Sequence, residues 1–164
     1  MGKLTRIKTP VRKAIDQASD NFSTLVAKIG YFPSAKYPDG TSIASIASIQ
    51  EFGAPSKNIP PRPFFRPTMD AQRAEWKQKM GQFAIRIMQG KMTVRSSFDA
   101  IGIVAAGQVR KTIATLMSPP LKKSTLLARQ SRARKGSKYK YLSTKPLIDT
   151  GDMYGHLTNV TEPE

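Results

Sequence analysis

Cysteine is absent from this chain of 164 residues, and histidine occurs only once. The absence of cysteine excludes disulfides, thiolate zinc sites, iron–sulfur clusters and cysteine nucleophiles. No apolar run approaches the roughly 20 residues of a membrane-spanning helix, and the start MGKLTRIKTP lacks the apolar stretch of a signal peptide. We therefore expect a protein that is made in the cytoplasm, contacts no membrane and holds no metal or cofactor.

Acidic residues are scarce, and their distribution is more informative than their number. The chain has 27 Lys and Arg against 11 Asp and Glu, a net charge of +16, and no acidic residue lies between Ala100 and Ile148. Exposed like charges at this density repel each other, so they indicate a polyanion or an acidic partner surface. The alternative is a merely solubilising surface. The candidate contact residues are Lys122, Lys123, Arg129, Arg132, Arg134, Lys135, Lys138 and Lys140.

The succession of helical and extended segments predicts an α+β fold, in which a small, mostly antiparallel sheet is packed by two or three helices. The length and the 39% hydrophobic content indicate one domain over residues 1–164. Its core is expected at about residues 11–120 and 146–160. Residues 122–145 are expected to form an extended, flexible basic arm, because a segment so polar cannot build a core.

Extended segments are predicted toward both ends of the chain. Thr24 to Phe32 mixes β-branched and aromatic residues, and the turn sequence Pro38-Asp39-Gly40 follows it. Residues 146–160 return to apolar spacing and predict a short turn followed by a strand. A short amphipathic helix is expected before the first strand, over residues 11–22, and a basic helix over residues 124–133.

Apolar residues recur at every third position from Ile43 to Phe52. This spacing favours a helix that is apolar over a wide arc and packed on more than one side. Gly53 follows at the position of a left-handed helix cap. The next segment, Asn58 to Pro67, contains four prolines and is expected to be extended, because proline cannot continue a helix.

Two longer helices are predicted in the middle of the chain. Thr68 is placed to cap a helix that runs to about Gly90 and buries one narrow seam. A second helix is expected from Phe98 to Met117, behind a capping box formed by Ser96 and Asp99. The seam of the first helix consists of Met69, Trp76, Met80, Phe83 and Ile87.

Strings that mark an enzyme are missing from the sequence. No glycine-rich phosphate-binding string is present, and His156 has no partner nearby in the sequence that completes a recognisable triad. Asp149 and Asp152 flank Thr150-Gly151, and turn or helix-cap chemistry explains this pair at least as well as acid–base chemistry. A binding or structural role is therefore favoured, and we assign no catalytic, cofactor-binding or metal-binding residue.

Glu51 and Arg62 flank the expected turn at Gly53 and are predicted to pair within one structural motif. A partly buried carboxylate needs such a partner to offset its desolvation. Gly53 is expected to adopt a positive φ, and Phe52, Phe64 and Phe65 are expected to be packing anchors. The structural motif residues are Glu51, Phe52, Gly53, Pro61, Arg62, Pro63, Phe64, Asp149, Thr150 and Gly151.

Three short strings stand in a specific order along the chain: EFG at 51–53, PPRPFFRPT at 60–68 and PLIDTG at 146–151. AKIGYF at 27–32 and SPPL at 118–121 belong to the same pattern. With these strings the chain resembles, over most of its length, the neck and tail-completion proteins of tailed bacteriophages.

The resemblance implies a non-enzymatic virion component of the neck and tail, made in the cytoplasm of a host bacterium. It implies a homo-oligomeric ring of sixfold or twelvefold symmetry between the portal-side neck adaptor and the tail terminator or tail tube proteins. Such a ring lines or seals the channel through which phage genomic DNA leaves. Because no base-reading element is identifiable, contact with DNA is expected to be directed at the phosphate backbone and independent of sequence.

Two other functions remain open. A free, sequence-independent nucleic-acid-binding protein would use Tyr139 and Tyr141 to stack on bases among the lysines. A membrane-active basic protein would need a strongly amphipathic cationic helix, and residues 124–133 form a segment too short and too weakly apolar for that role.

The basic segment from Arg129 to Lys145 is expected to be poorly protected from hydrogen exchange in the free subunit and to become ordered on assembly. Its charges are expected to be exposed, and exposed charges contribute little to stability. Replacing Arg129, Arg132, Arg134 and Lys135 together with Gln is therefore expected to leave folding nearly intact while DNA affinity falls.

Overall fold

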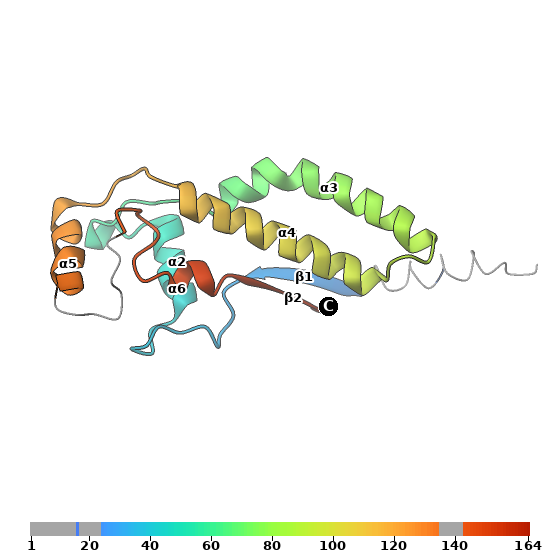
Figure 1. The fold of residues 1–164 in the computed structure, drawn as a ribbon, viewed down its shortest axis with the longest axis horizontal. Coiled ribbons are helices and arrows are strands. Elements are labelled where there is room, and N and C mark those ends of the chain that lie inside the picture. Colours follow the sequence, from blue (N-terminus) through green and yellow to red (C-terminus); the bar gives the residue numbers. More distant parts are fainter. Residues whose placement is uncertain (1–15, 17–23, 135–142) are drawn as a thin grey trace, which may run out of the picture.

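A long helical hairpin laid over a two-stranded sheet forms one end of the molecule, and shorter helices form the other (Figure 1). The structure, a computed structural model, describes residue 16, residues 24–134 and residues 143–164. One antiparallel sheet together with several helices makes this a small α+β fold, as the sequence predicts.

The sheet consists of β1 (Leu25–Gly30) and β2 (Thr158–Pro163), which bring together segments from near the two ends of the chain. The strands are antiparallel, in a register that pairs Leu25 with Pro163. Both strands lie where extended structure was predicted, although β2 continues three residues beyond the expected end. A pair of strands is only marginally stable alone, so the helix packed against this sheet is essential to it.

That helix is α4 (Val94–Thr115), which contacts both strands. It forms an antiparallel hairpin with α3 (Arg66–Met88), and Figure 1 shows α4 between α3 and the sheet. Because α3 is the outer layer, its predicted seam is shallower than expected. Of the five seam residues, Ile87 is buried, and the other four are half-buried.

Both long helices begin earlier than the sequence predicts. The capping box of α4 is formed by Thr93 and Ser96 instead of Ser96 and Asp99, because Thr93 has the extended backbone that a cap residue requires. Thr68 lies inside α3, where its hydroxyl donates to the carbonyl of Phe64 at 2.7 Å and caps nothing. The first N–H groups of α3 therefore need another acceptor.

The other end of the molecule carries α2 (Ile43–Phe52), a 3₁₀ turn (Pro55–Lys57), α5 (Lys123–Arg134) and the short helix α6 (Asp152–Gly155). Helices α2 and α5 confirm two of the predicted helices. A core cluster lies at this end and draws on segments that are distant in the sequence. It contains Ala35, Ile43, Ala47, Phe64, Val109, Ile113, Leu147, Met153 and Leu157.

Some predictions concern residues outside the described ones. The helix expected over residues 11–22 is among them, apart from Asp16, which is helical. Residues 135–142 are also outside, so the behaviour of this part of the basic arm stays a prediction. The affected candidate residues are Lys135, Lys138, Lys140, Tyr139 and Tyr141.

Candidate interaction site

Four of the strings on which the resemblance depends, EFG, PPRPFFRPT, SPPL and PLIDTG, meet at the end of the molecule that carries α2, α5 and α6, whereas AKIGYF lies on β1 and just after it (Figure 1). Three charged side chains are buried there: Glu51 and Arg62 are each 5% exposed, and Arg129 is 8% exposed. Charged side chains are almost never buried unless they are paired. The partners of these three residues therefore show how the site is held together.

Glu51, near the end of α2, caps the first turn of α3. One carboxylate oxygen accepts the N–H groups of Phe64 and Phe65 at 2.7 and 2.9 Å. The other accepts the N–H and the Nε–H of Arg66 at 3.1 and 3.0 Å. A carboxylate at this position satisfies N–H groups that have no partner within the helix and interacts favourably with the positive end of the helix dipole.

The predicted pair of Glu51 with Arg62 is wrong in its partner, because Arg66 supplies the guanidinium instead. The chain between α2 and α3 directs the side chain of Arg62 toward the segment that follows α4. Burial raises the pKa of the Glu51 carboxyl, but hydrogen bonds from Phe65, Phe64 and Arg66 outweigh burial and hold this pKa below its usual value. Glu51 is therefore ionised at neutral pH and acts as a structural acceptor.

Gly53 makes the turn between α2 and the proline-rich run, and its φ of 79° confirms the predicted positive value. Its N–H donates to the carbonyl of Ile49 at 2.8 Å and closes α2. A β-carbon at this position would lie 2.9 Å from the nitrogen of Pro61 and 3.0 Å from the carbonyl oxygen of Ile59. Both the backbone angles and the close approach therefore require glycine.

Arg62 joins the proline-rich run to the segment that follows α4. Its Nε and Nη2 donate to the carbonyls of Pro119 and Pro120 at 2.8 and 3.1 Å, and its Nη1 donates to the side chain of Gln50 at 3.2 Å. Its own N–H donates to the carbonyl of Gln50 at 2.7 Å. Burial, with the nearby charge of Arg129, lowers the pKa of Arg62. Each nitrogen of the Arg62 guanidinium therefore donates a hydrogen bond within the protein.

The aromatic and proline residues of the motif divide between core and surface. Phe64 lies in the core cluster, as predicted. Phe52 is 60% exposed, so the prediction that it is a packing anchor is wrong: the guanidinium of Arg66 lies over its ring at 4.5 Å from the ring centroid. Pro61 is exposed and Pro63 is half-buried, so these prolines fix the direction of the chain without filling the core.

Arg129 holds α5 against the segment that contains PLIDTG. Its Nη1 donates to the carbonyls of Ser143, Lys145 and Ile148 at 2.8, 3.0 and 3.0 Å. Its Nε lies 3.3 Å from a carboxylate oxygen of Asp149. The prediction that Arg129 faces a DNA channel or a partner is therefore wrong, because a turn in the chain directs these three carbonyls toward one point and the guanidinium fills it.

The other basic candidates whose side chains the structure describes lie at the surface. Lys122 and Lys123, at the start of α5, are exposed. Arg132 is also exposed, and its Nη2 lies 2.7 Å from Asp149. Arg134 is the last residue of α5. Of the candidates whose side chains are described, only Arg129 is thus buried, and Lys122 and Lys123 form no ion pair with any other described residue.

The Asp149-Thr150-Gly151 string forms a turn that leads into α6. Gly151 adopts a φ of 91° at the N-cap position, and the hydroxyl of Thr150 donates to the carboxylate of Asp152. Asp149 forms ion pairs with Arg129 and Arg132. Ion pairing therefore accounts for Asp149 and turn chemistry for Asp152. The described residues contain no group of three or more His, Asp or Glu side chains placed to hold a metal ion.

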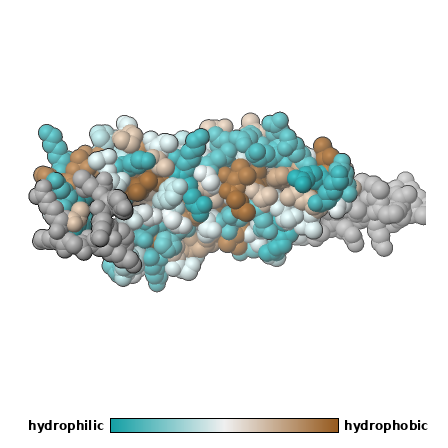
Figure 2. All heavy atoms as spheres, in the orientation of Figure 1, coloured by the Kyte–Doolittle hydropathy of each residue, from teal (hydrophilic) through white to brown (hydrophobic). Residues whose placement is uncertain are grey.

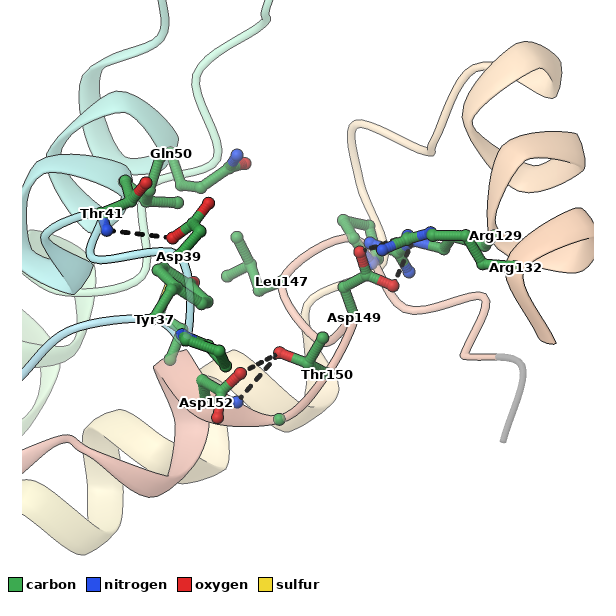
Figure 3. Close-up of a pocket in the computed structure, with 15 residues that line it drawn as sticks. Tyr37, Asp39, Thr41, Gln50, Arg129, Arg132, Leu147, Asp149, Thr150 and Asp152 are labelled. Carbon is green, nitrogen blue, oxygen red and sulfur yellow. Dashed lines mark hydrogen bonds and ion pairs between the residues drawn. The ribbon is translucent and has the colours of Figure 1, made fainter. Parts of the chain in front are cut away.

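An open cleft of about 510 Å³ lies beside this network (Figure 3). Figure 3 shows Tyr37 and Asp39 on one side, the arginines of α5 with Asp149 on the other, and Leu147 between them. Burial and then the charges of Asp152, Asp149 and Asp39 raise the pKa of Tyr37, so its hydroxyl remains a neutral hydrogen-bond donor. The residues that line the cleft offer polar contacts to another molecule, but they include no evident pair of a nucleophile and a base.

Comparison with protein-family models, with curated proteins and with solved structures gave no match in any of the three. Among the described helices, none is both long and apolar enough to cross a membrane. The functional argument therefore depends on the arrangement of the residues themselves.

The sequence did not indicate which groups accept hydrogen bonds from the buried Arg62 and Arg129. These are mostly backbone carbonyls, at Pro119 and Pro120 for Arg62 and in the segment 143–148 for Arg129. Every residue carries a carbonyl, so no residue type marks such a position. Arg66 was detectable, because it stands in the same string as Arg62 and is an equally good partner for a carboxylate.

Proposed function

We propose that this chain is a structural subunit of the neck of a tailed bacteriophage, where it forms a homo-oligomeric ring between the portal-side adaptor and the tail. The single observation that carries the proposal is the convergence of the neck-like strings. Their charged residues are buried and interlocked at one end of the molecule, through Glu51, Arg62 and the Arg129–Asp149 pair. A shared structural role explains why these strings occur together.

Apolar side chains at the surface supply contacts for neighbouring subunits. A closed ring needs two different surfaces on each subunit, because its contacts run head to tail. Large hydrophobic side chains are exposed on α2, after α4, on α5 and on α6, and Figure 2 shows a further apolar patch over the middle of the α3–α4 hairpin. Those at the string-bearing end are Phe52, Met117, Leu127 and Tyr154.

The charge of the chain suits a ring that surrounds DNA. Duplex DNA carries one negative charge per roughly 1.7 Å of its axis, and cations that face it release counterions. Lys122 and Lys123 are exposed beside the interlocked end, at the start of a helix that has no acidic residue. These two lysines, with Arg132, are the described candidates for the surface that faces the channel.

Sizing chromatography with light scattering, with and without duplex DNA, tests this proposal. We expect an assembly with the mass of six or twelve chains, whose formation is abolished when the exposed Phe52 and Leu127 are replaced by Ser. A control that replaces the exposed Ile85, at the far end of α3, should leave the mass unchanged. A monomer that binds DNA or RNA at all concentrations would instead support the second candidate, a free sequence-independent nucleic-acid-binding protein, which the net charge of +16 favours.

A further inference from the structure

The pairing of β1 with β2 directs alternate backbone groups of each strand away from the sheet. Glu164 donates its N–H to the carbonyl of Thr24 at 2.8 Å, and these residues extend the strand register by one pair. The pair is thus of the hydrogen-bonded type, and such pairs alternate with pairs that are not hydrogen-bonded. It follows that Leu25, Ala27 and Ile29 direct their N–H and C=O groups to the outer edge of β1.

The outer edge of β2 is closed by side chains of α4. Arg95 donates to the outward carbonyl of Thr161 at 3.0 Å, and Arg110 donates to the carbonyl of Leu157, just before β2. Pro163 has no N–H to offer. Blocking groups of this kind are how proteins protect edge strands from pairing with other chains. A further strand therefore cannot pair along β2.

Among the described residues, none gives the outer edge of β1 comparable protection. In the part of the chain that the structure describes, no hydrogen bond is made to the outward groups of Leu25, Ala27 or Ile29. β1 contains no proline and no bulge, and its one charge, on Lys28, lies on the solvent side of the sheet in an ion pair with Glu162. This edge can accept a strand over its whole length.

We propose that β1 pairs with β1 of a second copy of this chain, antiparallel about Ala27, and that two free subunits so form a four-stranded sheet. The sequence LVAKI is self-complementary in this register. Leu25 lies opposite Ile29 of the second copy, Val26 lies opposite Lys28, and Ala27 lies opposite itself. All the outward N–H and C=O groups find partners, and no two like charges face each other.

The faces of the two sheets also match in this register. Leu25, Ala27 and Ile29 share a face with Asn159 on β2, and the side chain of Asn159 lies against Gly102 of α4. A twofold axis through the joint, perpendicular to the sheet, keeps the α4 helices of both copies on one side. Apolar side chains from both copies are then neighbours beneath them, and because the β2 edges are blocked, the sheet stops at four strands.

This dimer does not rest on the proposed function. A twofold pair differs from the head-to-tail contacts of a ring, and the β1 edge lies apart from the exposed Phe52 and Leu127 to which the ring contacts are assigned. The joint covers one strand of six residues per copy. It is thus smaller than the roughly 800 Å² per partner of stable complexes, so the dimer is weak and depends on concentration.

Residue-resolved amide hydrogen exchange at low and high protein concentration tests the proposal. The N–H groups of Val26 and Lys28 bond to β2, so they should be protected at every concentration. Those of Ala27 and Ile29 should exchange freely in dilute protein and slow at least tenfold in concentrated protein. Equal exchange of Ala27 and Ile29 at all concentrations would overturn the proposal.

Two variants sharpen this test. Ala27→Pro removes an outward N–H and no bond to β2, so it should abolish the dimer in light scattering while the protection of Val26 and Lys28 persists. Lys28→Ala, on the same strand, should leave the dimer intact. If the proline variant does not fold, a spin label on K28C reports instead, because the chain has no other cysteine. Dipolar broadening should grow with concentration, and its absence would contradict the pairing.

Discussion

Replacing Arg129 with Gln should loosen α5 and the segment that follows it. The guanidinium donates hydrogen bonds to three carbonyls and forms an ion pair with Asp149, and Gln can replace at most part of these contacts. Removing one partner of a buried charged group costs about 3–5 kcal/mol, but Asp149 is 43% exposed and can be solvated by water. We therefore expect a loss of about 2–4 kcal/mol, or roughly 6–12 °C in Tm for a chain of this length.

Arg132→Gln is the matched control for this prediction. Arg132 lies one turn later on α5, contacts the same Asp149 and is 53% exposed, so its loss should cost no more than about 1 kcal/mol. Thermal unfolding gives the overall loss, and hydrogen exchange in residues 123–134 and 143–149 locates it. If the two variants have the same Tm and the same exchange, Arg129 holds nothing, and the reasoning from its buried contacts is refuted.

Three further predictions concern the motif and the basic surface. Gly53→Ala should destabilise the fold by about 1–3 kcal/mol in chemical denaturation, because the turn requires a positive φ and leaves no room for a β-carbon. The pKa of Glu51 is lower in the folded chain than in the unfolded chain. The contribution of the Glu51 carboxylate to the unfolding free energy is therefore full above about pH 4.5 and is lost as the pH falls through the pKa of the folded chain. In Glu51→Gln this part of the acid dependence should disappear from the unfolding free energy. Replacing Lys122 and Lys123 with Gln should make the salt dependence of DNA binding shallower by about 0.9 for each phosphate that the protein no longer neutralises, whereas Lys77→Gln on α3 should leave the slope unchanged.

The fold was predictable from the sequence where local pattern and packing agree. The apolar spacing from Ile43 to Phe52 and the glycine that follows predict α2 correctly, because both signals are local and depend only on residues within about one helical turn of each other. The start of α3 was misplaced because its cap comes from Glu51, a residue of another helix. Tertiary contacts of this kind leave no signal in the local sequence.

For the candidate site, the sequence predicted which residues lie together but not which residue contacts which. The strings identify the residues that meet, but the partner of each depends on the path of the chain between them. A basic residue in a run of basic residues is normally solvated, so nothing in the sequence distinguishes Arg129 from Arg132. The structure separates the two because one turn of α5 places Arg129 against the carbonyls and Arg132 at the surface.

Electron cryomicroscopy of tailed particles made from the genome that encodes this chain tests the central claim most directly. The proposal predicts a ring of this chain in the neck, between the adaptor and the tail, with Lys122 and Lys123 facing the channel and Glu51 still capping α3. Particles whose neck contains no density for this chain, although the chain is produced in the same cells, would contradict the proposal.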